Sequence, residues 1–267
     1  MPRVAFNLLG IDIYYYSAFL CFGILMGMIF VLDGVQKSRQ NKNLYLDFIF
    51  LAIIFGVLGA RIYFVIFSWR YYSQDLLKIF AIREGGLAIY GAIISVFILS
   101  IFFCKKFNLN QSLFFDTLVP GLLVGQIIGR WGNFFNREAF GKNSNNLFAM
   151  RLLASKINNI PNSVMPTIIN EVKHIQVHPT FFYESALNFL FLIFILFYKR
   201  FKKFSGEIFL LYLLFYGLIR FFIENLRTDQ LKFFNVPVSQ VFSLIIFITS
   251  IIFLVKKYLE DCFNARK

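Results

Sequence analysis

The stretch YLDFIFLAIIFGVLGARIYFVIFS, residues 45–68, is apolar over almost its whole length. A helix needs about 20 mainly apolar residues to cross a bilayer, because each residue rises 1.5 Å through a hydrocarbon core about 30 Å thick. Arg61 stands inside this stretch, after Gly56 and Gly59, and places a guanidinium at membrane depth. The stretch therefore predicts a membrane-spanning helix that carries an informative charge.

Six further apolar runs indicate that the whole chain is an all-α integral membrane protein with about seven transmembrane helices. The 267 residues are 58% hydrophobic and 15% charged, with a mean hydropathy of +0.68, which leaves too little polar surface for a soluble domain. The predicted spans are residues 13–32, 45–68, 86–104, 113–129, 181–198, 206–224 and 236–255. We expect them to form a single transmembrane domain over residues 1–267.

Lysine and arginine cluster after every second span, and this pattern predicts the orientation. The clusters are Lys37, Arg39 and Lys42; Lys105 and Lys106; Lys199, Arg200, Lys202 and Lys203; and Lys256, Lys257, Arg266 and Lys267. By the positive-inside rule their side is cytoplasmic, so the N-terminus faces outward and the C-terminus inward. Within the loop from about 130 to 180, Pro161 and Pro166 argue against another span. Residues 142–177 are expected to form a small outward-facing head.

The net charge of +13 does not indicate nucleic-acid binding, because the cations form no continuous basic face. Cys21, Cys104 and Cys262 are odd in number and far apart, so they predict neither a disulfide framework nor a zinc site. His174 and His178 are four residues apart but lack an evident third ligand. We expect no metal and no soluble cofactor.

Charged residues inside or beside the spans are the main candidates for function, because each is costly in hydrocarbon unless it has a partner. Arg220, Glu224 and Arg227 are spaced to share one face of a helix, and Glu184 opens the fifth span. Internal ion pairing is one explanation. The other is capture of a lipid phosphate, because Arg61, Arg130, Arg220 and Arg227 outnumber the acids that can neutralise them.

Two polar segments add to these charges. Gly121, Gly125 and Gly129 form a ridge that predicts close helix packing, and it leads into RWGNFFNREAFG, residues 130–141. Glycine lets backbone approach a ligand, while asparagine and arginine supply directed donors. The fifth span opens with HPTFFYE, residues 178–184, where Pro suits a first helical turn and Tyr183 and Glu184 are expected to point inward.

These motifs resemble the prolipoprotein diacylglyceryl transferase family. Residues 130–141 are similar to its signature G-R-x-G-N-F-x-N-x-E-x-x-G, and residues 84–91 (EGGLAIYG), 178–184 and 216–227 (YGLIRFFIENLR) match in the expected order. Gly59-Ala60-Arg61, and Tyr16 seven residues before Gly23, also look like the family. The resemblance covers nearly the whole chain.

The resemblance implies an enzyme of the bacterial inner membrane with a periplasmic head. Its expected partners are phosphatidylglycerol, other membrane lipids, and the signal peptide and lipobox cysteine of a prolipoprotein; glycerol 1-phosphate leaves. By analogy Arg130 and Arg220 are the essential cations, with functional positions at Tyr16, Asn133, Glu138, Gly141 and Glu224. We also expect Arg61, Asn136, His178, Tyr183, Glu184 and Arg227 to bind substrate, with Glu224 holding Arg220 or Arg227.

Tyr90 departs from the pattern, because many family members carry His there. A phenol with a pKa near 10 is a poor base at neutral pH, so Tyr90 either binds and orients substrate or leaves proton removal to Glu138 or His178. Two other classes of protein stay open on the residues alone. A lipid or solute transporter also places charges in its spans, and a membrane scaffold explains spans and glycine ridges but not the polar segments.

Overall fold

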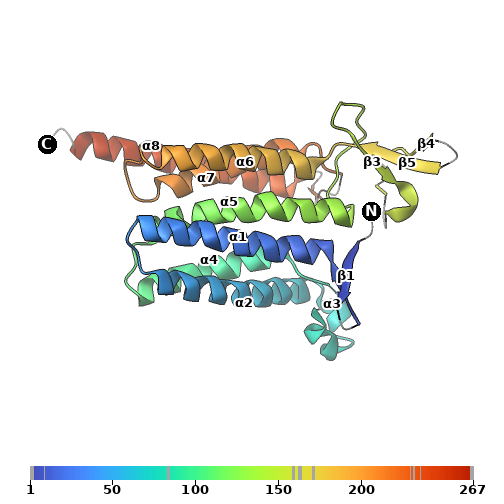
Figure 1. Cartoon of the computed structure of the whole chain (residues 1–267), viewed down its shortest axis with the longest axis horizontal. Helices are drawn as coiled ribbons and strands as arrows, with labels where there is room; N and C mark the ends of the chain where they lie inside the picture. The colour runs from blue at the N-terminus through green and yellow to red at the C-terminus, as the bar shows by residue number, and fades with distance from the viewer. Residues whose placement is uncertain are drawn as a thin grey trace. The chain divides into compact units, whose positions relative to one another are not determined.

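The computed structural model describes residues 3–8, 10–82, 85–157, 160–161, 164–169, 172–228, 230, 232–234 and 236–264. Seven helices in this part have 18 residues or more: α1 (Tyr15–Lys37), α2 (Lys42–Phe67), α4 (Ile89–Lys106), α5 (Gln111–Asn136), α6 (Thr180–Tyr198), α7 (Glu207–Glu224) and α8 (Val238–Asn264) (Figure 1). Six of them are long and apolar enough to cross a membrane. The exception is α7, whose 18 residues include Glu207, Arg220 and Glu224. The predicted multi-pass, mainly helical architecture is confirmed.

Four helices, α1, α4, α5 and α8, extend beyond their predicted ends, and α5 and α8 do so by the most. The α5 helix continues from the expected end at residue 129 to Asn136, so the first half of the polar segment 130–141 is helical rather than loop. The α8 helix continues past residue 255 to Asn264. Between α2 and α4 lie α3 (Trp69–Tyr72) and a 3-10 helix (Leu76–Phe80), and a second 3-10 helix (Ala154–Lys156) follows β3.

Short antiparallel strands, which the apolar pattern did not predict, connect or precede the helices. The β1 strand (Val4–Leu8) pairs with β2 (Ile11–Tyr14), so the first helix begins at Tyr15 rather than at residue 13. The strands β6 (Lys232–Phe233) and β7 (Val236–Pro237) form another hairpin. Between α5 and α6, β3 (Met150–Leu153), β5 (Val172–Val177) and β4 (Thr167–Ile169) form a sheet in that order.

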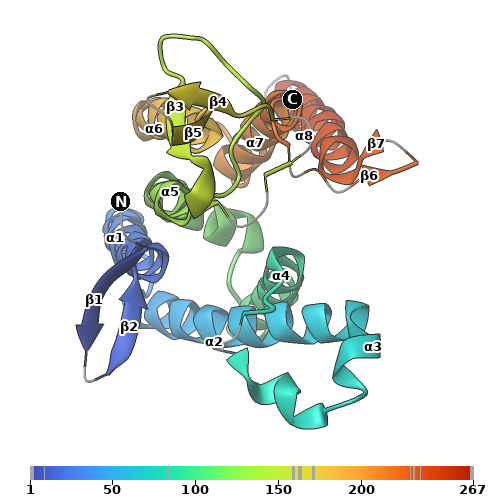
Figure 2. The ribbon, with the colours of Figure 1, turned by 90° about the vertical axis from the view of Figure 1, so that its right-hand side faces the viewer.

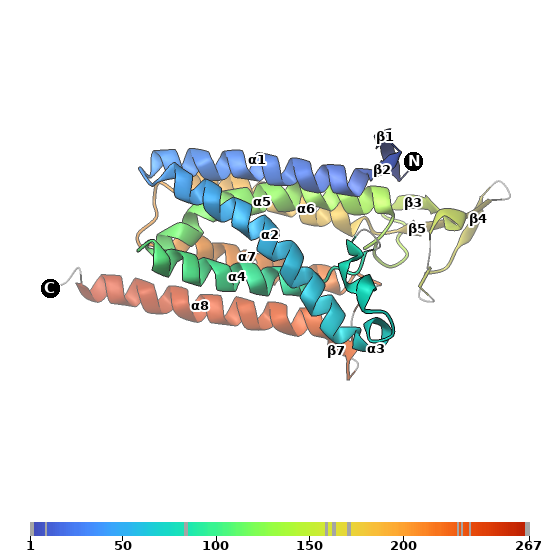
Figure 3. The ribbon, with the colours of Figure 1, turned by 90° about the horizontal axis from the view of Figure 1, so that it is seen from below.

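The chain divides into two compact units. The unit of residues Val31–Thr117 is built on the crossing of α2 and α4 (Figure 3). A side chain at Gly59 would approach the carbonyl oxygen of Gly91 to 2.7 Å, so the crossing requires glycine on both helices. The rings of Tyr45, Phe48 and Phe114 fill its core in tilted and edge-to-face contacts.

The other unit, Met1–Phe30 and Leu118–Lys267, places α5 beside α1, α6 and α7, with α8 packed on α7 (Figure 2). A Cβ at Gly27 would lie 2.7 Å from the carbonyl oxygen of Gly121, and one at Gly23 would lie 3.2 Å from that of Gly125. The glycine ridge is therefore a helix-packing surface, as predicted. Gly129 differs, because nothing lies within 4 Å of a Cβ built there.

A buried carboxylate ties α6, α7 and α8 together where α6 ends and α7 begins. Oε1 of Glu207 accepts hydrogen bonds from the hydroxyls of Tyr198 and Tyr258, and Oε2 accepts one from the backbone N–H of Lys203 at 2.6 Å. Glu207 is fully buried. Its partners satisfy a charge that would otherwise be costly inside the bundle.

The sheet between α5 and α6 encloses a core of its own. Leu152 and Ile175 lie opposite each other in register and are buried with Phe140, Val164 and Val177. The other side of this segment carries exposed apolar side chains such as Leu147. The region predicted as the head thus has a packed sheet, which composition alone did not reveal.

Candidate active site

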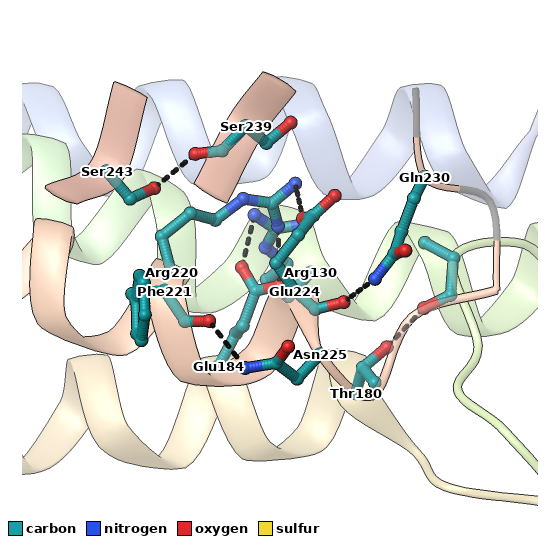
Figure 4. A network of polar contacts seen from close by, with 11 residues as sticks. Arg130, Thr180, Glu184, Arg220, Phe221, Glu224, Asn225, Gln230, Ser239 and Ser243 are labelled. Carbon is teal, nitrogen blue, oxygen red and sulfur yellow. Dashed lines mark hydrogen bonds and ion pairs between the residues drawn. The ribbon is translucent and has the colours of Figure 1, made fainter. Parts of the chain in front are cut away.

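Three helices bring Arg130, Glu184 and Arg220 together (Figure 4). One guanidinium nitrogen of Arg130, on α5, forms an ion pair with Oε2 of Glu184, on α6. The other oxygen of Glu184, Oε1, accepts a hydrogen bond of 3.0 Å from Nη1 of Arg220, on α7. A single carboxylate therefore bridges the two arginines, and the predicted proximity of Arg130 and Arg220 is confirmed.

Glu224 adds a second carboxylate on the same helix as Arg220. Its Oε2 lies 3.0 Å from Nη2 of Arg220, one helical turn away, as an ion pair rather than a directed hydrogen bond. The prediction that Glu224 holds Arg220 or Arg227 is therefore met for Arg220. The four side chains carry two positive and two negative charges, so the expected surplus of cations is wrong for this cluster.

Arg227 does not lie on the α7 face that carries Arg220 and Glu224. The helix ends at Glu224, with Asn225 as its C-cap, and Arg227 instead forms an isolated β-bridge with Gly141. Backbone pairing past the helix end overrides the seven-residue spacing that suggested a shared face. The shared face predicted for Arg227 is therefore wrong.

Backbone hydrogen bonds join the segments that follow α5, precede α6 and follow α7. The N–H of Gly141 donates to the carbonyl of His178 at 2.9 Å, the N–H of His178 to Lys142 at 3.0 Å, and the N–H of Lys142 to Leu226 at 2.8 Å. Oγ1 of Thr180 donates to the carbonyl of Ala139. This junction fixes the ends of three helices around the arginine cluster.

Gly141 lies at the centre of the junction, and its need for glycine is steric. A Cβ there would lie 2.7 Å from Cβ of His178 and 2.9 Å from the carbonyl oxygen of Leu226. Any larger residue would push these segments apart. The position predicted as functional thus shapes the site through backbone packing.

Asn133, Asn136 and Glu138 form a second polar group at the end of α5. Oε1 of Glu138 accepts hydrogen bonds from the side-chain amides of Asn133 at 3.0 Å and Asn136 at 3.2 Å. Arg137 and Ala139 have φ values of +56° and +55°, in the left-handed region that side chains disfavour. The turn they form brings the exposed carboxylate of Glu138 back over its own helix.

Tyr16 packs on the same helix. A Cβ at Gly132 would lie 2.8 Å from the ring of Tyr16, so the absence of a side chain at Gly132 lets Tyr16 pack closely on α5. Ring stacking of Tyr15 on Phe135, with centroids 4.4 Å apart, fixes the neighbouring turn. Tyr16 also lies within electrostatic range of Arg130 and Glu138, and its role in substrate binding stays a prediction.

His178 and Tyr183 contact each other at the start of α6. Nδ1 of His178 lies 3.2 Å from the hydroxyl of Tyr183, at hydrogen-bond distance. Tyr183 therefore interacts with His178. Glu184, the next residue, is buried, as predicted, and pairs with the two arginines, which was not predicted.

Gln126 was not predicted but lies one helical turn before Arg130 on α5. Its amide nitrogen donates to the hydroxyl of Tyr212, on α7, at 2.6 Å. Oε1 of Gln126 is buried and has no hydrogen-bond partner among the described residues. A lone glutamine in an apolar run was the available signal. Its four-residue spacing from Arg130 places both side chains on one face.

The sequence matches the family described as prolipoprotein diacylglyceryl transferase over residues 3–256. The chain belongs to this family. Its relatives include the phosphatidylglycerol–prolipoprotein diacylglyceryl transferase of Finegoldia magna, 40% identical over 257 residues that cover 96% of each chain. The protein of the same name from Clostridioides difficile is 37% identical over 245 residues, 92% of this chain and 91% of the relative. The one from Bacillus mycoides is 35% identical over 270 residues, 98% and 97% of the two chains.

Two residues of the transferase motifs, Arg61 and Tyr90, belong to the other unit, Val31–Thr117. Nε of Arg61 donates to the carbonyl of Ile79, Nη1 to Gly85 and Gly86, and Nη2 to Lys78 and Ala81. These bonds use all five N–H donors of a guanidinium. Arg61 thus organises the segment between α3 and α4, and this structure leaves it no donor for a phosphate.

Tyr90 lies in the first turn of α4 and is partly exposed, with its ring 6.5 Å from that of Tyr63. Glu84, the first residue of the same family-like stretch, lies outside the described residues. The role of Tyr90 in binding or proton transfer stays a prediction.

The described part of the chain contains no group of three or more His, Cys, Asp or Glu side chains suited to a metal ion. Guanidinium, carboxylate, amide and phenol groups lie near Arg130. Such a set can bind a phosphate, orient hydroxyls and accept a proton.

Proposed function

We propose that this chain is a phosphatidylglycerol–prolipoprotein diacylglyceryl transferase. It transfers the diacylglyceryl group of phosphatidylglycerol to the thiol of a prolipoprotein lipobox cysteine. A C–S thioether bond forms as the C–O bond to phosphate breaks, and the leaving group, glycerol 1-phosphate, takes the electron pair. The observation that carries the proposal is the convergence of Arg130 and Arg220 on Glu184 in a chain of this family.

The nucleophile belongs to the substrate, so the enzyme itself needs no reactive cysteine. A free thiol titrates near pH 8.5, so the thiolate forms readily. Holding the lipid carbon in line and stabilising charge on the leaving phosphate are the harder tasks. We assign the second task to the guanidinium groups of Arg130 and Arg220, whose side chains are 24% and 16% exposed while Glu184 is 5% exposed.

Around this clamp, Tyr16 and Asn133 orient the glycerol part of the lipid. Asn133 lies one helical turn after Arg130 on α5, and Tyr16 packs against Gly132, between them. The side-chain amide of Asn133 already donates a hydrogen bond to Glu138. Glu138 is the better candidate for removing the thiol proton, because its carboxylate is exposed, whereas His178 interacts with Tyr183. Arg227 and Gly141 act through the junction that fixes these groups.

We further propose that the protein lies in the bacterial inner membrane with the arginine cluster at the periplasmic side. Within the unit that contains both ends of the described chain, Arg130 lies near the end of α5 and Glu184 near the start of α6. These helix ends lie at the same end of the unit as the β1–β2 hairpin and the strands β3 and β5, and α8 ends at the other (Figure 1). Lys199, Arg200 and Lys203 follow α6 at that other end, which supports a cytoplasmic assignment.

Reconstitution tests the function directly. The purified full chain is placed in vesicles with labelled phosphatidylglycerol and a peptide that carries a lipobox cysteine. We expect a diacylglyceryl thioether on the peptide and one released glycerol phosphate per modified peptide. A transporter would move lipid or solute without forming that bond. Folded protein that yields no thioether product would refute the transferase assignment.

A further inference from the structure

The two arginines of the cluster differ in how they are anchored. Among the residues the structure describes, Arg220 contacts two carboxylates, Glu184 and Glu224, whereas Arg130 contacts only Glu184. Figure 4 shows both guanidinium groups turned toward the Glu184 carboxylate. Removing Glu184 from this arrangement leaves Arg220 still paired and Arg130 without an ionic partner.

Glu184 occupies the donors that an incoming phosphate would use. Its two oxygens take Nη2 of Arg130 and Nη1 of Arg220, which resembles the way two oxygens of a phosphate bridge neighbouring arginines. Two arginines and two carboxylates make the cluster neutral, so excess positive charge does not attract the lipid. Binding of a phosphate to both arginines therefore requires Glu184 to give way.

The charges of substrate and product make the return of Glu184 useful. The lipid is a phosphodiester with one negative charge, whereas glycerol phosphate is a monoester with a charge of about −1.5 to −2 at neutral pH. A fixed pair of arginines would hold this product more tightly than the substrate. A carboxylate that competes for the same donors weakens product binding.

Building on the transferase assignment above, we propose that Glu184 is an exchangeable positioning residue that stands in for the substrate phosphate. It holds Arg130 and Arg220 in register while the site is empty, yields them to the lipid phosphate, and then helps to expel glycerol phosphate. Glu224 keeps Arg220 in place throughout the exchange. Glu184 itself does not touch the reacting atoms.

Glycerol 1-phosphate binding to the full chain in detergent, measured by titration calorimetry, tests this exchange. Glu184→Gln keeps the shape of the side chain but removes its charge, so we expect glycerol 1-phosphate to bind about tenfold tighter or more. The matched variant Glu224→Gln removes a charge that contacts only Arg220, and the expected tightening is smaller. The single-turnover rate constant for transfer by Glu184→Gln should exceed its steady-state kcat, because product release becomes rate-limiting.

Weaker or unchanged binding of glycerol 1-phosphate to Glu184→Gln would overturn the exchange, because a purely structural glutamate predicts loss of the arginine geometry. If Glu184→Gln does not fold, Glu184→Asp carries the test: its shorter carboxylate retracts from the arginines, and binding between wild type and the Gln value is expected. Tighter binding without any thioether product supports the exchange and refutes the transferase assignment. Normal transfer by Glu184→Gln with unchanged binding of glycerol 1-phosphate supports the transferase assignment and refutes the exchange.

Discussion

Arg61 and Arg130 both sit in helices that can cross a membrane, yet their partners differ in kind. Arg61 donates to backbone carbonyls through all three of its nitrogens, whereas Arg130 pairs with the side chain of Glu184. Carbonyls of a packed segment cannot leave without local unfolding, but a side chain can change rotamer. A ligand can therefore compete for Arg130 and not for Arg61.

Replacing Arg130 with lysine should abolish most transfer. An ammonium cannot present two parallel N–H donors to a phosphate or carboxylate, so we expect a loss of about 100-fold or more in kcat/KM. The lipobox-peptide assay measures it. Arg151→Lys, on β3, is the matched control, because Arg151 is exposed and bonds only to Gln176 among the described residues. Near-normal turnover of Arg130→Lys would defeat the phosphate clamp.

Arg61 is expected to affect stability rather than lipid binding. Arg61→Met removes the donor from five part-buried hydrogen bonds to backbone carbonyls, and each lost bond costs about 1 kcal/mol. We expect a thermal midpoint lower by several degrees in detergent, whereas Arg70→Met, at an exposed position of α3, should change it little. An unaltered midpoint in Arg61→Met together with weaker phosphatidylglycerol binding would instead support the direct substrate role that the sequence suggested.

At the scale of single residues, the sequence could predict which charges meet but not how they are shared. Arg130, Glu184 and Arg220 stood out because charge at membrane depth needs a partner. Their pairing depends on contacts between helices, and the spacing of residues along one helix does not predict such contacts. The five carbonyl partners of Arg61 are backbone atoms, and backbone atoms leave no signature in a sequence.

Helices α1 and α5 meet through glycine, and this crossing sets the distance between Tyr16 and the polar end of α5. Gly27→Ala puts a methyl group 2.7 Å from the carbonyl oxygen of Gly121, so the helices must separate. We expect a loss of about 1–3 kcal/mol in the free energy of unfolding. Gly129→Ala is the matched control on the same ridge, because its methyl group meets open space. Equal effects of the two changes in thermal unfolding would contradict the packing argument.

The ends of α5 and α7 show why the bounds of the helices could be predicted only in part. The prediction ended α5 where hydropathy falls, at residue 129. A fall in hydropathy marks the end of the apolar run and not the end of the helix, which continues to Asn136. The opposite error affected α7, where the spacing of Arg220, Glu224 and Arg227 predicts a helical face that includes Arg227. There the backbone pairs with Gly141 instead of continuing the helix. A contact with a segment distant in the sequence therefore accompanies the end of α7, and such contacts are not visible in the local pattern.

The orientation of the whole molecule can be tested with single cysteines. Cys21, Cys104 and Cys262 are first replaced by alanine, and Leu147→Cys or Arg200→Cys is then introduced at exposed positions. A membrane-impermeant thiol reagent should label position 147 in intact spheroplasts, because we propose that segment 142–177 faces the periplasm. Position 200 should react only after permeabilisation. The reverse pattern would invert the topology and place the arginine cluster at the wrong leaflet.

The junction at Gly141 also separates the inserted segment 142–177 from the residues of the candidate active site. Lys142 and His178 bound the inserted sheet, and a backbone hydrogen bond of 3.0 Å already joins them. The insert therefore leaves the bundle at Lys142 and returns at His178, which lie next to each other. Its length and sequence can diverge among relatives, or be exchanged by design, while the segments that carry Arg130 and Glu184 stay where they are.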